Sequence, residues 1–187
     1  MRQLGGTELK RLHRSWRRKD SFRLSLLLED VQSPFNVGSI MRTAAALSVS
    51  ELYVVGRTPA PNSPKVQKTA LGTGRYLSFS THEDVKTAVQ AARADGYLVV
   101  GLELADEAQP LAALDLRRDV CLIIGNEDRG LSATALSLCD AAGYVPQTGR
   151  VGSLNVAVAT AVACYEVRRQ AWGAGVPVLD SGDADEA

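Results

Sequence analysis

Val145-Pro-Gln-Thr-Gly-Arg-Val-Gly-Ser-Leu-Asn-Val156 is the stretch that decides the fold, because it joins a short predicted strand to a long apolar helix. The N-terminus of a helix offers unpaired backbone N–H groups, so a glycine-containing loop in front of it can hold a ligand. Ser153 is the predicted N-cap of this helix, and Asn155 presents an amide in its first turn. The helix is predicted over residues 153–172.

Apolar side chains lie on almost every side of this predicted helix as far as Glu166. A helix that is apolar on most sides has to be covered on most sides. In a domain of this size, part of the helix is therefore predicted to form a subunit interface. The alternative is that the helix is simply buried within one chain.

An earlier segment, Pro34-Phe-Asn-Val-Gly-Ser-Ile-Met-Arg-Thr43, has the same build and follows another predicted strand. Asn36 is the expected N-cap of its helix. Gly38 and Arg42 are four residues apart and share a helix face, so a ligand could approach the backbone of Gly38 beside the guanidinium. The alternative is a capped helix that carries an exposed surface arginine.

The remaining junction is Ile124-Gly-Asn-Glu-Asp-Arg-Gly-Leu-Ser132, a turn in which Glu127 could orient a substrate hydroxyl or amine. Along the chain, β-rich runs are interspersed with helical runs. Strands are predicted at residues 24–31, 51–55, 76–79, 97–101, 120–125 and 142–145, and helices from residue 36 and at residues 66–71, 83–94, 132–139 and 153–172. This pattern indicates an α/β fold, a parallel sheet flanked by helices. Ligands of such sheets bind at the carboxyl ends of the strands, where all three junctions fall and are predicted to form one composite pocket.

The chain has 187 residues, of which 45% are apolar and 22% charged, as is typical of a soluble protein with one domain. It contains no apolar run long enough to cross a membrane and no signal-peptide core, so a cytoplasmic protein without a membrane partner is predicted. Cys121, Cys139 and Cys164 stand in apolar surroundings without a Cys/His cluster. They are interpreted as core thiols, and no metal site is expected.

The formal net charge is zero, but the charges are unevenly distributed. Residues 1–23 form a basic arm, for which RNA contact is predicted because lysine and arginine neutralise phosphates. The candidate RNA-binding residues are Arg11, Arg14, Arg17, Arg18 and Lys19. The alternative is a solvated helix face. Residues 24–173 are predicted to form the folded domain, and the acidic tail at residues 174–187 is predicted to be disordered.

In this order, the three junctions resemble the motifs of the SpoU branch of the SPOUT RNA methyltransferases, and more narrowly of its TrmH-like members. The motifs are Glu29-Asp-Val-x-x-Pro34-x-Asn36-x-Gly38-x-x-x-Arg42-Thr43, Ile124-Gly125-x-Glu127-x-x-Gly130-Leu131-Ser132 and Val145-Pro146-x-x-Gly149-x-Val151-x-Ser153-Leu154-Asn155-Val156. The similarity extends from about residue 17 to residue 172. Each motif alone is moderately specific, and the three in this order are highly specific.

The resemblance implies a deep C-terminal trefoil knot, a homodimer with its site near the subunit interface, and S-adenosylmethionine held among the knot loops. The implied activity is methyl transfer to a ribose 2′-hydroxyl of structured tRNA or rRNA. By analogy, the catalytic residues are Arg42, Asn36, Glu127, Ser153 and Asn155. The cofactor contacts implied in the same way are Leu102, Gly125, Val145 and Leu154.

Two roles are open for Arg42. The family proposal makes it the general base, although a free guanidinium stays protonated and a neighbouring phosphate favours the charged form. The other role is a phosphate clamp that aligns the ribose. For the whole chain, the alternative to an enzyme is a non-catalytic RNA-binding or assembly factor with the same fold, which the intact set of site residues argues against. Methylation of an RNA base is disfavoured by the first motif.

Overall fold

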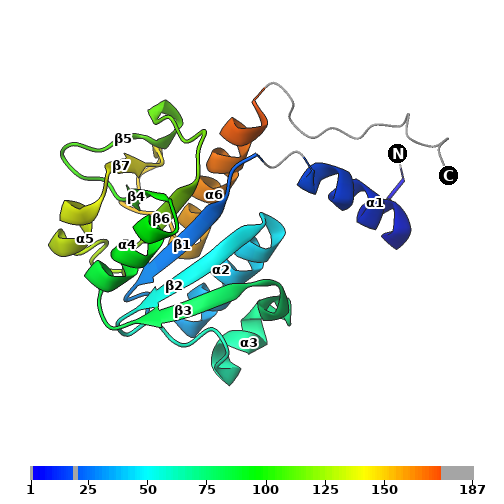
Figure 1. Ribbon diagram of the computed structural model, residues 1–187, viewed down its shortest axis with the longest axis horizontal. Helices are drawn as coiled ribbons and strands as arrows, with labels where there is room; N and C mark the ends of the chain where they lie inside the picture. Colours follow the sequence, from blue (N-terminus) through cyan, green and yellow to red (C-terminus); the bar gives the residue numbers. More distant parts are fainter. Residues whose placement is uncertain (1, 19–20, 174–187) are drawn as a thin grey trace.

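The computed structural model describes residues 2–18 and 21–173, so Lys19 and the acidic tail at residues 174–187 lie outside the described residues. Figure 1 shows the elements in the order of the chain. The helices are α1 (Gly6–Arg17), α2 (Pro34–Ala46), α3 (Pro64–Ala70), α4 (Val85–Ala94), α5 (Ala133–Leu138) and α6 (Val156–Trp172), with short 3-10 helices η1 (Thr73–Tyr76) and η2 (Leu111–Ala113). The strands are β1 (Leu24–Glu29), β2 (Val49–Val55), β3 (Ser78–His82), β4 (Leu98–Leu102), β5 (Gln109–Pro110), β6 (Val120–Ile124) and β7 (Ala141–Tyr144).

The strands form one sheet in the order β3-β2-β1-β6-β4-β7-β5, and every pairing in it is parallel. Strand β6 lies at the centre and pairs with β1 on one side and with β4 on the other. Because the strands run the same way, their carboxyl ends share one edge of the sheet. The predicted parallel α/β fold is confirmed.

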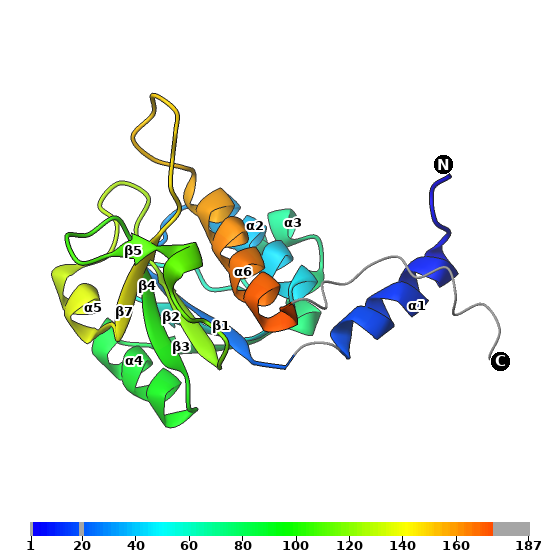
Figure 2. The ribbon, with the colours of Figure 1, turned by 90° about the horizontal axis from the view of Figure 1, so that it is seen from above.

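Helices cover both faces of the sheet (Figures 1 and 2). On one face α2 and α6 lie side by side, and α3 packs on α2. On the other face lie α4 and α5. Strand β1 is buried on both sides: Leu26 and Leu28 pack toward α2 and α6, and Leu27 packs toward α4. This is why its sequence reads as a continuous apolar run instead of an alternating one.

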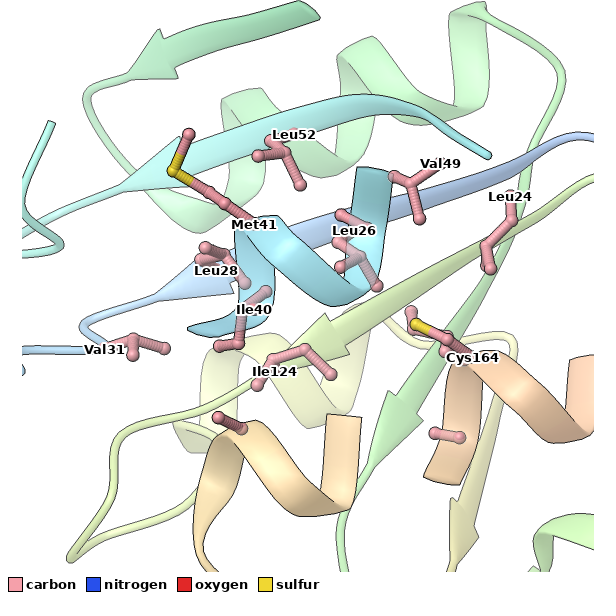
Figure 3. Packing of buried hydrophobic residues seen from close by; sticks show 14 of the residues in the cluster. Leu24, Leu26, Leu28, Val31, Ile40, Met41, Val49, Leu52, Ile124 and Cys164 are labelled. Atoms are coloured by element: carbon pink, nitrogen blue, oxygen red, sulfur yellow. The ribbon is translucent and has the colours of Figure 1, made fainter. Parts of the chain in front are cut away.

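The core beneath α2 is formed by large aliphatic side chains with no exposed surface. Figure 3 shows Ile40 and Met41 of α2 next to Leu26 and Leu28 of β1 and Leu52 of β2. Burying such a side chain stabilises the fold by about 1.5–3 kcal/mol relative to leaving it exposed. The core thus holds α2, and the residues at its first turn, firmly against the sheet.

The buried guanidinium of Arg168 fastens α6 to the far end of α2. It donates hydrogen bonds to the backbone carbonyls of Phe22, Leu47 and Ser48, at 2.7, 2.8 and 2.7 Å. Leu47 is the C-cap of α2, and carbonyls at a helix C-terminus lack partners within the helix. A cation is also favoured there by the helix dipole. Arg168 therefore helps to set the positions of the two helices whose opposite ends carry sequence motifs.

The element boundaries differ from the predictions by a few residues. Strand β1 ends at Glu29 instead of at residue 31, and α6 begins at Val156 instead of at residue 153. The short strand β5 is not among the predicted strands. A two-residue strand has no periodicity of its own, and β5 exists because it pairs with β7.

Candidate functional site

Four neighbouring strands, β1, β6, β4 and β7, end at one edge of the sheet. The loops after β1, β6 and β7 carry the three sequence motifs. Ligands of open α/β sheets bind outside the carboxyl ends of the strands. The predicted placement of all three junctions at this edge is confirmed.

Side-chain hydrogen bonds join the three junctions. Asn36 Nδ2 donates to Glu127 Oε1 at 2.9 Å, and Asn155 Nδ2 donates to Asn36 Oδ1 at 3.1 Å. Asn36 is therefore a donor toward one junction and an acceptor from the other, which fixes the orientation of its amide. Only 6% of Asn36 is exposed, so an unpaired amide group here would be costly.

The carboxylate of Glu127 also organises the start of α2. It accepts the backbone N–H groups of Gln32 and Ser33, each at 3.0 Å and each on a different oxygen. Burial opposes ionisation, but the hydrogen bonds outweigh it and hold the pKa of Glu127 below its usual value. Three donors thus occupy an ionised carboxylate. All three donors belong to the protein itself. The first role of Glu127 is therefore to hold the Asn36 amide and the start of α2 in place.

Asn155, and not Ser153, is the N-cap of α6. Asn155 Oδ1 accepts the backbone N–H groups of Ala157 at 2.9 Å and Val158 at 3.3 Å. Ser153 stands in the loop before the helix with an exposed side chain. The prediction that Ser153 caps this helix is therefore wrong. Both residue types are good caps, so the residue type alone cannot choose between them.

The first motif differs from its prediction in the same way. Ser33 caps α2, because Ser33 Oγ accepts the backbone N–H of Asn36 at 3.4 Å, and Pro34 occupies the first turn. The prediction that Asn36 is the cap is wrong. Its position inside the first turn leaves the Asn36 side chain available to Glu127 and Asn155.

Gly38 faces another helix and not a ligand. A Cβ atom at this position would lie 2.7 Å from Thr69 Cβ and 2.8 Å from the carbonyl oxygen of Val66, both on α3. Helix α3 thus fills the space that the sequence pattern left for a ligand. The absence of a side chain at Gly38 lets α2 and α3 pack closely.

The loop after β6 is held in place by residues that were not predicted as site residues from the sequence motifs. Asn126 Nδ2 donates to a backbone carbonyl in the loop after β1, at 2.8 Å. Glu29 accepts the backbone N–H of Ser132 at 3.0 Å and its hydroxyl at 2.6 Å. Glu103 accepts the backbone N–H of Leu131 at 2.9 Å. For Glu29 the available signal is a carboxylate at the end of an otherwise apolar buried strand.

Arg42 lies apart from this network. Arg42 follows Asn36 by six residues, which is more than one and a half turns of helix. The two side chains therefore lie on different sides of α2. Its side chain is exposed, and it makes no hydrogen bond or ion pair with any other residue in the described ranges. Phe35 and Ser39 share its side of α2, by their spacing of seven and three residues. The guanidinium is therefore free to meet a group from outside this chain.

The candidate cofactor contacts lie on loops that adjoin at the carboxyl edge, since β6, β4 and β7 are neighbours in the sheet. Leu102 ends β4, Gly125 follows β6 and Val145 follows β7. Leu154 lies just before α6. The same loops carry exposed apolar side chains, with Leu104 71% and Val151 69% exposed. Apolar surface beside backbone polar groups suits a ligand with a flat aromatic base and a polar chain. The residues present therefore fit an adenosine-containing cofactor.

No helix in the described part of the chain has the length and apolar character needed to cross a membrane. Within residues 2–18 and 21–173, no three His, Cys, Asp or Glu side chains gather in a way that could hold a metal ion. Burial raises the pKa of Cys121 and of Cys164 to about 12, which leaves both as unreactive core thiols.

Comparison with known proteins agrees with this geometry. Residues 23–165 match the model of the SpoU rRNA Methylase family. The tRNA (guanosine(18)-2'-O)-methyltransferase of Escherichia coli K12 is 32% identical over 164 residues, which are 88% of this chain and 71% of that protein. The 23S rRNA (guanosine-2'-O-)-methyltransferase RlmB of Acinetobacter baylyi is 34% identical over 151 residues, 80% of this chain and 61% of that one.

Among solved structures, the AdoMet-bound rRNA methyltransferase from Sinorhizobium meliloti is similar with a TM-score of 0.74 and 30% identity. The similarity covers 81% of this chain and 59% of that one. The family match spans all three motifs and the sheet that carries them. This chain therefore belongs to the SpoU rRNA methylase family.

Proposed function

We propose that this chain is an S-adenosylmethionine-dependent methyltransferase that modifies the 2′-hydroxyl of a ribose in structured tRNA or rRNA. The observation that carries the proposal is the hydrogen-bonded series Asn155–Asn36–Glu127, which ties the three family motifs together at one edge of the sheet. The relatives named above include both a tRNA and a 23S rRNA methyltransferase, so the proposal covers both classes of RNA.

The residues of the chain have two tasks in this reaction. S-adenosylmethionine supplies an electrophilic methyl group when it is bound, and backbone groups at Leu102, Gly125, Val145 and Leu154 are proposed to hold it. The ribose hydroxyl is a very weak acid, so the chain must align its oxygen and provide for the loss of its proton. Asn36, Glu127, Ser153 and Asn155 are proposed to keep the loops and the ribose in position.

Arg42 is proposed to act on the RNA as general base or as phosphate clamp. Its exposure and its lack of partners in the described residues support contact with a group outside this chain. A planar guanidinium suits a phosphate because it can donate two parallel hydrogen bonds. The clamp also needs no deprotonated arginine, which is rare in proteins.

Replacing Arg42 tests the proposal. We expect Arg42→Ala to lower methyl transfer to unmodified tRNA and rRNA by at least about 10²-fold, while calorimetry gives nearly unchanged cofactor binding. Arg118→Ala, an exposed arginine at the opposite edge of the sheet, is the matched control and should retain both. Parallel loss of cofactor binding in Arg42→Ala would contradict both roles.

The variant Arg42→Lys separates the two roles. If the side chain is the base, the rate of the lysine variant rises with pH as its amine deprotonates near pH 10. If the side chain is a clamp, the rate falls over the same range because the positive charge disappears. Wild type serves as the reference, since arginine keeps its charge throughout.

The basic arm is proposed to bind the RNA backbone. Helix α1 contains no buried residue, and Arg11, Arg14 and Arg18 fall on one exposed side of it. Such a row of guanidinium groups can follow a series of phosphates. Arg17 follows Arg14 by three residues and lies beside this row, and Lys19 lies outside the described residues.

A homodimer is proposed, with the interface formed by the exposed sides of α2 and of the first half of α6. Leu154, Val158 and Val162 are 36%, 50% and 42% exposed on or just before α6, and Phe35 on the neighbouring α2 is 66% exposed. An apolar patch of this kind marks an interaction surface in a soluble protein. Arg42 shares the side of Phe35, so a second copy on this face would lie close to the guanidinium.

The proposal includes the deep trefoil knot among the C-terminal loops, supported by the similarity to solved members of the family. It also includes a division into a basic arm at residues 1–23, a methyltransferase domain at residues 24–173 and an acidic tail at residues 174–187. The protein is proposed to act in the cytoplasm.

A further inference from the structure

A groove of about 1010 Å³ lies at the end of the molecule opposite the motif loops. It is lined by α1, by the last residues of α2, by η1, by the starts of β2 and β3, and by the end of α6. Because α6 rises about 1.5 Å per residue, its far end stands about 25 Å from the cap residue Asn155. The groove is thus separate from the site formed by the three motifs.

Aromatic side chains form part of the wall of the groove. Trp16, Tyr76, Tyr165 and Trp172 all line it. Tyr76 is 65% exposed and Tyr165 51% exposed, which is unusual for large rings. The rings of Tyr165 and Trp172 meet edge to face, with centroids 5.9 Å apart. Such packing holds the ring of Tyr165 in place, and its 51% exposure leaves surface on which a base can stack.

The charge of the groove has one sign. Arg17 and Arg75 line it, and no described lining residue is Asp or Glu. The guanidinium of Arg75 lies over the ring of Tyr76, 4.7 Å from its centroid. The groove therefore combines fixed positive charge with flat aromatic faces, the two features that single-stranded nucleic acid requires.

We propose that this groove binds unpaired nucleotides of the substrate RNA, with bases stacked on the aromatic rings and phosphates beside Arg17 and Arg75. The inference rests on the proposed function, because it takes RNA as the substrate. It adds that recognition includes a single-stranded segment held about 25 Å from the ribose that is methylated. Stacking tolerates any base, so the groove selects an unpaired structure and not a sequence.

The two tryptophans of the chain provide a direct signal, because Trp16 and Trp172 are the only ones and both line the groove. Fluorescence of the full chain is titrated with a ten-nucleotide oligouridylate, without cofactor, and binding is measured in parallel on filters. We expect tryptophan emission to be quenched in proportion to bound RNA. We also expect affinity to fall steeply as salt rises, because phosphate contacts release counterions.

Variants of exposed residues test the location without threatening the core. Tyr76→Ala and Arg75→Ala should each weaken oligouridylate binding by about tenfold, as expected for loss of one stacked base or one cation beside it. The matched controls are Phe79→Ala, an exposed ring on β3 outside the groove, and Lys86→Ala, an exposed cation on α4. Both controls should bind as wild type does. Cofactor binding should be the same in all five proteins.

Three outcomes would overturn the inference. In the first, RNA binds on filters without quenching either tryptophan, so it binds elsewhere. In the second, Tyr76→Ala and Arg75→Ala bind as tightly as the controls. In the third, emission changes with protein dilution and not with RNA, which would show that a second copy occupies the groove. None of these measurements uses methyl transfer. A wild-type protein whose tryptophan emission is quenched by RNA, but which transfers no methyl group, would therefore refute the proposed function and still support RNA binding in the groove.

Discussion

At the scale of single residues, the amide of Asn36 has one productive orientation. Its nitrogen faces the carboxylate of Glu127 and its oxygen faces the amide nitrogen of Asn155. Exchanging the amide oxygen and nitrogen of Asn36 or of Asn155 would place like groups against each other. The direction of these hydrogen bonds is therefore as much a property of the site as the residues themselves.

This polarity predicts a specific pattern in a double-mutant cycle. Asn36→Asp opposes two carboxylates, and Glu127→Gln turns an amide nitrogen toward a backbone N–H, so each should lower the free energy of unfolding by about 1–3 kcal/mol. In the double variant, the new amide at 127 can donate to the new carboxylate at 36, and Asn155 still donates to position 36. We expect it to lose less than the two single losses combined, in urea unfolding of all four proteins. Strict additivity would contradict the coupling.

The depressed pKa of Glu127 predicts a pH dependence of stability. The folded protein holds this proton less tightly than the unfolded chain, so the stabilisation is complete above the usual pKa of 4.5 and is lost as the pH falls through the lower folded-state value. The difference in free energy of unfolding between wild type and Glu127→Gln should therefore shrink below about pH 4.5. A difference that stays constant across this range would show that Glu127 does not titrate as described.

The sequence motifs select Asn36, Glu127 and Asn155 correctly as neighbours in one site, because strand ends in a parallel sheet meet. The partners of each side chain cannot be predicted in the same way. A cap depends on where the helix begins, and Ser33 and Asn155 directly precede α2 and α6, where Asn36 and Ser153 were expected as the caps. Residue type leaves this choice open, since serine and asparagine cap equally well.

At the scale of elements, the contact between α2 and α3 depends on Gly38. The sequence shows a glycine four residues before an arginine, a spacing that suits a ligand as well as a crossing helix. Only the packing of α3 decides between them, and the sequence predicts this short helix without indicating that it packs on α2. The lack of a side chain at Gly38 is then explained by the close approach of α2 and α3.

Gly38→Ala should destabilise the protein although alanine is the better helix former. The added methyl would lie 2.7 Å from Thr69 Cβ and 2.8 Å from a backbone oxygen of α3. Overpacking of this kind costs about 1–3 kcal/mol, more than the propensity gain of about 1 kcal/mol. Thermal unfolding followed by circular dichroism measures the change. Gly6→Ala, at a glycine with open space around it, is the control and should not lower the melting temperature.

At the scale of the whole molecule, α2 and α6 leave apolar side chains exposed on one side, and the proposed homodimer would cover them. The sequence predicts part of this result, because α6 is apolar on more sides than one domain needs to bury. It does not show that Phe35 joins the same surface, since this follows from the packing of α2 beside α6. The proposed interface and the exposed Arg42 therefore belong to one face.

A charge placed on this face should separate the subunits. We expect wild type to sediment at about twice the mass of the 20.0 kDa chain, and Val162→Asp to sediment as a monomer with much lower methyl transfer. Leu71→Asp, which changes an exposed leucine at the end of α3, should remain dimeric and active. A wild-type protein that is monomeric and fully active would remove the dimer from the proposal.

The central position of β6 affects how the chain folds during synthesis. Strands β1, β2 and β3 can pair as soon as they emerge, but the other side of β1 pairs only with β6, which begins at Val120. Ribosomes add about 5–20 residues per second, so the open side of β1 waits on the order of ten seconds for its neighbour. During that interval an apolar strand edge is accessible to chaperones and to other nascent chains, and the speed of translation becomes a determinant of yield.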